Sequence, residues 1–99
     1  MKYENKLKEL NITLPDAKAP VGNYVAAKIL GKILFISGQI SIGENGELIK
    51  GKIGKELDTQ AGYHAAKRCA LSIVAQVKKA CNDDLDKVKS CIKLTGYVN

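Results

Sequence analysis

The chain has 99 residues, of which 45% are hydrophobic and 26% are charged. This composition is typical of one small globular domain and excludes a collagenous, disordered or multidomain chain. No apolar run approaches the roughly 18 residues of a membrane span, and the polar N-terminus lacks the apolar segment of a signal peptide. These features favour a cytoplasmic protein without membrane contact.

The charge balance is basic, since 16 lysine and arginine residues against 10 acidic residues give a net charge of +6. Such a balance can attract nucleic acid or anionic substrates. The lysines are scattered over every segment, however, and few aromatic side chains lie among them to stack on bases. The pattern therefore favours a solvated lysine-rich surface over a nucleic-acid track.

The first predicted element is a short amphipathic helix over residues 3–10, because Tyr3, Leu7 and Leu10 are spaced i, i+4, i+7. Residues 14–22 hold both prolines and predict a connector, since proline removes a backbone donor and favours extended geometry in the preceding residue. We therefore divide the chain into an N-terminal helix with its connector, 1–22, and a compact domain, 23–99.

Two β-rich runs, 24–29 and 33–37, follow the connector. They flank Leu30-Gly31-Lys32, which predicts a tight hairpin with Gly31 at a positive φ. The next residues, 38–54, hold five glycines and predict a loop with a turn at Glu44-Asn45-Gly46.

The strongest periodic signal predicts a long helix that Asp58 or Thr59 can cap and that Asn82-Asp83-Asp84 ends. Its predicted apolar face comprises Gly62, Ala66, Cys69, Ala70, Ile73, Val74, Val77 and Cys81. From Val88 to Val98, apolar and polar residues alternate, which predicts an amphipathic strand.

The widths of these elements do not match. Three or four strands about 4.8 Å apart form a sheet roughly 14 to 19 Å wide, whereas a helix is about 10 Å across. One helix therefore leaves part of the apolar sheet face uncovered. Either further helices and strands outside this chain or a partner subunit must cover the rest.

Chemically reactive side chains are few. The odd number of cysteines, without a CxxC pair and with only His64 as imidazole partner, favours neither a disulfide framework nor a zinc site. His64 lies on the polar side of the predicted helix, which favours a surface histidine over a general base. Cys69 and Cys81 fall on the apolar stripe as small core residues, whereas Cys91 shares the parity of neighbouring lysines.

The informative local feature is Ser37-Gly38-Gln39 at the end of a hydrophobic strand. Gly38 lets a ligand approach backbone N–H groups, and Ser37 offers a hydroxyl, although the spacing alone favours an ordinary strand end. Tyr24 on the partner strand either points its phenol into a cleft or caps the core. The glycines of residues 43–54 match no phosphate-binding pattern.

Four segments, taken in order, resemble the Rid (reactive intermediate deaminase) family, also known as YjgF or L-PSP endoribonuclease. They are Pro20-Val21-Gly22-Asn23-Tyr24, the run from Leu30 to Ile40 (LGKILFISGQI), the helix 63–80 and Asp86-Lys87-Val88-Lys89. The hydrophobic strand that ends in SGQI after a glycine turn is the most specific of them.

The resemblance implies an α+β, chorismate-mutase-like fold, in which a mixed β-sheet carries helices on one face. It also implies a homotrimer with active sites in clefts between subunits, and hydrolysis of enamines and imines such as 2-aminoacrylate to 2-oxo acids and ammonia. By that resemblance, Tyr24 lines the cleft and binds substrate, and Ser37 and Gly38 form part of the pocket wall. No metal and no organic cofactor are expected.

Two departures limit this resemblance. The family uses an arginine to clamp the substrate carboxylate and a late acidic residue to position water, and neither has a counterpart here. We expect both after Asn99, with the second helix and last strands, so that this chain is the N-terminal two-thirds of a domain with impaired activity. Arg68, the sole arginine, lies on the main helix and cannot replace the clamp. Asn23 stands where members often carry proline, which leaves the substrate open.

Three other interpretations stay open at this point. A small-molecule or RNA-binding module without deaminase activity is favoured by the charge of +6 and by the ribonuclease and translation-inhibitor names of family members. The second is a structural scaffold or an unproductive truncated product. The third is a complete protein of 99 residues that dimerises or swaps elements to cover its sheet.

Overall fold

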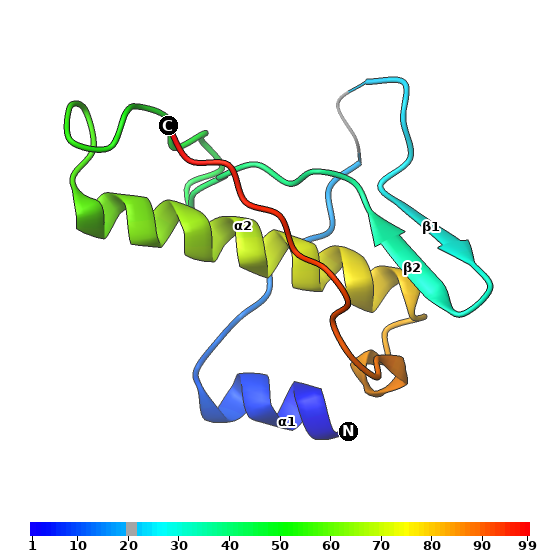
Figure 1. Ribbon diagram of the computed structural model, residues 1–99. Coiled ribbons are helices and arrows are strands. Elements are labelled where there is room, and N and C mark those ends of the chain that lie inside the picture. Colours follow the sequence, from blue (N-terminus) through cyan, green and yellow to red (C-terminus); the bar gives the residue numbers. More distant parts are fainter. Residues whose placement is uncertain (20–21) are drawn as a thin grey trace.

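The computed structural model describes residues 1–19 and 22–99 and is shown in Figure 1. Its elements, in chain order, are α1 (Lys2–Glu9), β1 (Ala27–Leu30), β2 (Ile33–Ile36), α2 (Thr59–Ala80) and the 3-10 helix η1 (Leu85–Lys87). The hairpin of β1 and β2 packs on α2, and α1 packs on η1. The predicted α+β class and the N-terminal helix are confirmed. Pro20 and Val21 of the predicted connector lie outside the described residues.

The hairpin forms as the sequence predicts. β1 and β2 are antiparallel, with Leu30 opposite Ile33 and Lys28 opposite Phe35. Gly31 has φ +62°, and a glycine with positive φ at the first of two turn positions is typical of a type II′ hairpin turn. β1 begins later than predicted, at Ala27 instead of residue 24, and β2 ends one residue earlier, at Ile36.

The long helix α2 also has the predicted ends. The Asp58 side chain accepts a hydrogen bond of 2.8 Å from the backbone N–H of Ala61, which satisfies one of the free donors of the first turn. At the other end, Asn82 and Asp83 have φ of +55° and +64°. Two consecutive residues in the left-handed region cannot continue a right-handed helix, so α2 stops there.

The predicted turn at residues 44–46 is confirmed. The N–H of Gly46 donates to the carbonyl of Gly43 at 3.0 Å, and the N–H of Glu47 donates to Oδ1 of Asn45 at 3.0 Å. Ile42 and Leu48 form an isolated antiparallel bridge on either side of the turn. The loop is therefore a small closed unit rather than an open excursion.

The predicted apolar face of α2 is wrong in part. Ala75 and Gln76, the buried residues of this helix, lie outside the predicted set, whereas Ala66 and Ala70 of that set are exposed. The reason is that burial depends on what packs against a helix, and the two-stranded sheet covers only one side of α2. The stripe that periodicity identifies is left half-open. The predicted sheet of three or four strands is not found among the described residues, whose sheet has two strands.

The predicted C-terminal strand is also wrong for this structure. Residues 88–99 carry no regular secondary structure, and the apolar members of the alternation, Ile92, Leu94 and Val98, are 72–86% exposed. A strand exists only by pairing with a neighbour, and this segment pairs with neither β1 nor β2. Its end is held instead by a hydrogen bond of 2.9 Å from the N–H of Ile53 to the carbonyl of Asn99.

Little of the described chain is buried. The buried hydrophobic side chains among residues 1–19 and 22–99 are Ala75 and Leu85, each 5% exposed. The radius of gyration is 14.3 Å, whereas a compact chain of about 100 residues has about 13 Å. Neither α1 nor α2 in this part of the chain combines the length and apolar character of a membrane-crossing helix.

Candidate functional site

The candidate residue Ser37 lies at the end of the hairpin opposite its turn, next to Val25, which follows Tyr24 in the chain. The N–H of Ser37 donates to the carbonyl of Ala26 at 2.9 Å, and the Ser37 hydroxyl donates to the carbonyl of Val25. These two bonds extend the ladder by one residue pair beyond the strands and place Ser37 beside the residues that follow Tyr24. Tyr24 itself is half-exposed.

Gly38 presents a free backbone donor at the same place. In an antiparallel ladder, successive residues face the partner strand and solvent alternately, so the bond made by Ser37 points the N–H of Gly38 away from β1. Within the described residues, no acceptor is bonded to that N–H. A Cβ built on Gly38 would meet no atom within 4 Å, which leaves the backbone open to a ligand.

The Ser37–Gly38 corner is suited to binding rather than to proton transfer. The amide of Gln39 donates to the carbonyl of Ser37 at 3.0 Å and steadies the corner. The Ser37 oxygen keeps lone pairs that can accept a hydrogen bond, while Gly38 donates one. Among the described residues, no imidazole or carboxylate is hydrogen-bonded to Ser37 or Tyr24, so neither hydroxyl has an activating base here.

A second polar group ties the turn at residues 44–46 to α2. Nε2 of His64 lies 2.9 Å from Oε1 of Glu44, and Nε of Arg68 donates to the carbonyl of Ile42 at 2.7 Å. The backbone N–H of Glu44, and then the His64 imidazole, hold the pKa of the Glu44 carboxyl below its usual value. His64 is thus a surface histidine with a partner, and Arg68 holds a loop carbonyl.

The cysteines show no sign of nucleophilic chemistry. Cys69 and Cys81 are half-buried, which agrees only in part with their predicted place in the core. Cys91 is exposed, as is every residue from 89 to 99. Burial raises the pKa of the Cys69 thiol, which keeps it protonated and poorly nucleophilic.

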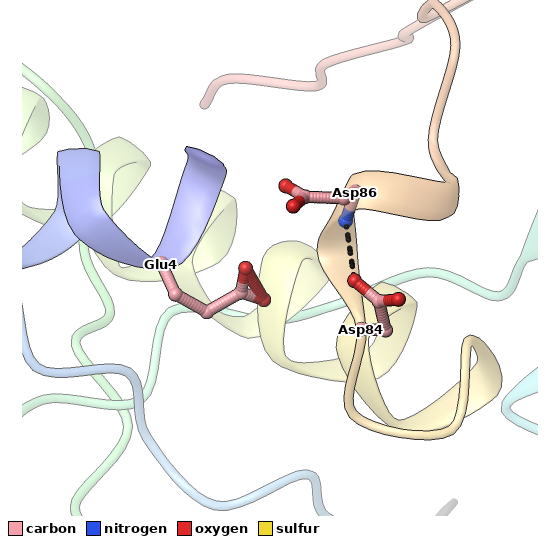
Figure 2. A group of neighbouring side chains, drawn as sticks. All are labelled: Glu4, Asp84 and Asp86. Atoms are coloured by element: carbon pink, nitrogen blue, oxygen red, sulfur yellow. Dashed lines mark hydrogen bonds between the residues drawn. The ribbon is translucent and has the colours of Figure 1, made fainter. Parts of the chain in front are cut away.

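Sequence reasoning missed a cluster of three carboxylates, shown in Figure 2. Glu4 extends from α1 toward Asp84 and Asp86 at η1, and one oxygen of each lies within 4.8 Å of the others. Asp86 accepts hydrogen bonds from the N–H groups of Lys2 and Tyr3 at 2.9 and 3.1 Å, which lowers the pKa of its carboxyl.

The other two carboxylates of this cluster cap η1. Oε2 of Glu4 accepts from the N–H of Leu85 at 3.0 Å, and Oδ1 of Asp84 accepts from the N–H of Asp86 at 3.0 Å. The cluster is therefore a reciprocal pair of helix caps that joins α1 to η1. An aspartate followed two residues later by another is a local signal for the cap at η1, but no local pattern reveals the contact with α1.

Comparison with known proteins agrees with the resemblance of the sequence. The family model described as "YjgF/chorismate_mutase-like, putative endoribonuclease" matches residues 4–99. The protein TCP17 of Trypanosoma cruzi is 41% identical over 93 residues, which cover 94% of this chain and 58% of TCP17.

Two solved structures share the fold. The protein Atu1372 of Agrobacterium tumefaciens, of unknown function, has a TM-score of 0.69 and 41% identity over 83% of this chain and 49% of its own. A protein of Shewanella oneidensis described as "a putative endoribonuclease" has a TM-score of 0.73 and 34% identity over 80% of this chain and 52% of its own.

The chain thus spans between about half and three-fifths of the length of these relatives. The family match covers nearly all of the chain, and the two structures carry the same chorismate-mutase-like arrangement of hairpin and helix. The chain therefore belongs to the YjgF/chorismate-mutase-like family.

Proposed function

We propose that the protein is a Rid-type hydrolase that converts small imines or enamines of the 2-aminoacrylate type to 2-oxo acids and ammonia. The observation that carries the proposal is the free N–H of Gly38 beside the Ser37 hydroxyl, at a place where no side chain blocks the backbone. A small planar carboxylate fits such a corner, because its oxygens accept hydrogen bonds from backbone N–H groups. The resemblance of the sequence to the Rid family, which implies this chemistry, supports the proposal as well.

The reaction adds water across a C=N bond. The water oxygen bonds to the imine carbon, the nitrogen takes up protons, and the C–N bond then breaks to release ammonia and leave a carbonyl group. In this scheme Gly38 binds a carboxylate oxygen of the substrate, and the Ser37 oxygen accepts a hydrogen bond from the imine nitrogen or the water. Tyr24 borders the same corner. We assign no proton transfer to this chain, since no titratable group is bonded to Ser37 or Tyr24 among the described residues.

The proposal includes assembly into a homotrimer with the site in a cleft between subunits. Its support is the apolar face of the hairpin on which Leu30, Ile33 and Phe35 lie, since these three side chains are 43–70% exposed. Exposed apolar surface of this kind marks a protein–protein contact more often than a solvated face. A second subunit on this surface would also exclude water from the site.

Turnover of 2-iminopropionate, generated in place by an amino-acid oxidase, tests the function when pyruvate is measured with and without the protein. We expect Gly38→Ala to lower kcat/KM about tenfold or more, because the added Cβ stands where the substrate must approach the N–H of residue 38. A hydrogen bond to a charged group that is lost in this way contributes about 1.5–3 kcal/mol. Gly96→Ala is the matched control, because its added Cβ also meets no atom and neither glycine has a positive φ.

A binding measurement keeps the site testable where turnover is slow. A 2-oxo acid such as pyruvate, the reaction product, should shift the amide resonance of Gly38 in a 15N-labelled sample. If the chain neither accelerates pyruvate formation nor shows this shift, the proposal is wrong.

A second candidate is RNA binding or cleavage, which the charge of +6 and the endoribonuclease description of the family favour. Neutralised phosphates release counterions, so RNA affinity should fall steeply with salt. Anisotropy of a labelled single-stranded RNA across a salt series, together with a gel assay for cleavage, tests this candidate. A flat response without cleavage excludes it.

A further inference from the structure

A groove follows the outer edge of β1, between this strand and the last turns of α2. It is lined by residues 26–29 and by Gln76, Lys79 and Ala80, and its volume is about 420 Å³. Successive side chains of a strand point to opposite faces. Four consecutive residues of the hairpin line the groove and none of β2 does, so the groove exposes the strand's edge rather than one of its faces.

This edge carries unpaired backbone groups. The bond from the N–H of Ser37 to the carbonyl of Ala26 fixes which residues of β1 bond to β2. The backbone N–H and carbonyl groups of Lys28 and Leu30 therefore point toward β2, while those of Ala27 and Ile29 point outward. In this alternation neither Ala27 nor Ile29 bonds to β2, and no hydrogen bond outside the ladder uses their N–H or carbonyl groups among the described residues. An edge of this kind is a template for another extended chain.

The walls of the groove are positively charged. Lys28 on β1 and Lys79 on α2 both line it, and the small side chains of Ala27 and Ala80 leave room between them. Gln76, which is 3% exposed, donates its amide to the carbonyl of Lys18 at 2.7 Å and fixes the α2 side of the groove. Opposite charge on an incoming strand is therefore favoured.

We propose that the outer edge of β1 binds an acidic peptide in an extended conformation, which adds as a third strand beside β1. Main-chain hydrogen bonds to Ala27 and Ile29 provide the attachment, and Lys28 and Lys79 select glutamate or aspartate side chains. A second copy of this chain suits the groove less well. In a symmetric antiparallel pairing of two β1 edges, the Lys28 side chains would lie close together and repel each other. The site does not include Gly38, which lies on the β2 side of the hairpin.

The first test uses the unmodified 99-residue chain and the hexapeptide Val-Glu-Glu-Val-Glu-Glu. Its consecutive glutamates point to both faces of the added strand, so that one faces Lys28 and the next faces the α2 side. Hydrogen–deuterium exchange should show about tenfold or greater slowing of the Ala27 and Ile29 amides at saturating peptide, because these N–H groups become hydrogen-bonded. The amides of Lys28 and Leu30, already bonded to β2, should change little. This alternation distinguishes strand addition from general stabilisation.

The second test uses anisotropy of the labelled peptide. Lys79→Glu should weaken binding several-fold and raise affinity for a valine–lysine peptide, whereas Lys79→Arg should bind as the parent does. Ala27→Pro removes an outward N–H without removing a ladder bond, and should weaken binding about tenfold. Lys93→Glu is the charge control, because Lys93 does not line the groove.

Three outcomes overturn the proposal. One is the absence of alternating protection at Ala27 and Ile29 in the unmodified chain. This test does not depend on whether the Ala27→Pro variant folds. Another is equal affinity for the glutamate and lysine peptides. The third is concentration-dependent dimerisation that the acidic peptide does not compete with, because the edge is then occupied by a second copy. None of them bears on imine hydrolysis at Gly38.

Discussion

Leu85 is the large hydrophobic side chain with the least exposure in the described chain, at 5%, and its truncation tests whether the α1–η1 junction is a cohesive part of the fold. Leu85→Ala removes three carbon groups, each contributing about 0.8 kcal/mol of burial, or about 2.4 kcal/mol together. The cavity left behind adds to this figure, and measured Leu→Ala changes in cores span about 2–5 kcal/mol. Because this core is thin and able to collapse, we expect a loss of about 2–3 kcal/mol.

Urea unfolding followed by circular dichroism measures the change in the free energy of unfolding. Leu94→Ala is the matched control, since Leu94 is 72% exposed and the same three carbon groups are removed. We expect the control to stay within about 0.5 kcal/mol of the parent. Equal effects of the two substitutions would refute the reasoning, because Leu85 would then be no more buried in solution than a surface residue.

Two further predictions concern polar and backbone features. Asp86 has a lowered pKa in the folded chain, so its contribution to stability is present above its ordinary value of 3.8 and is lost as pH falls through the folded pKa. Asp86→Asn should therefore lower the free energy of unfolding near neutral pH and weaken the pH dependence of that free energy between about pH 5 and about pH 2, as measured by urea unfolding. An unchanged pH dependence contradicts this prediction. Gly31→Ala should lower the free energy of unfolding by about 1–2 kcal/mol in the same assay, because alanine is strained at φ +62°. No atom lies within 4 Å of the new Cβ, so backbone strain is the only cost expected. A loss no larger than that of Gly96→Ala would contradict this.

Elements controlled by short-range chemistry could be predicted from the sequence. The hairpin turn follows from the positive φ that Gly31 accepts, and the start of α2 follows from the Asp58 carboxylate and the N–H groups it caps. The turn at residues 44–46 follows from the Asn45 side chain, which bonds the backbone two residues later. In each case the interacting groups lie within a few residues of each other, so a local pattern is sufficient.

Features that depend on distant segments could not be predicted in this way. Asp86 meets Lys2 across 84 residues of sequence, and no periodicity signals such a contact. The buried side of α2 is set by the hairpin and by Lys18, which bonds Gln76, rather than by the stripe of apolar residues. The same holds for the candidate site. Ser37 and Gly38 stand out in the sequence, but the outward direction of the Gly38 N–H depends on how β1 and β2 pair.

The two edges of the hairpin differ in a way that separates binding from sheet extension. Beside β2, Ile33 and Phe35 are 43% and 55% exposed, so a strand added there must bury apolar side chains. Beside β1, Ile29 and Leu30 are also exposed, at 59% and 70%, but Lys28 and Lys79 flank this edge and favour an acidic strand. Lysine at an edge also discourages unspecific pairing. A sheet extended along β2 would still leave Gly38 past the end of that strand, where its N–H can meet a ligand. Because the corner at Gly38 and the groove beside β1 lie on opposite sides of the hairpin, both can be occupied at the same time.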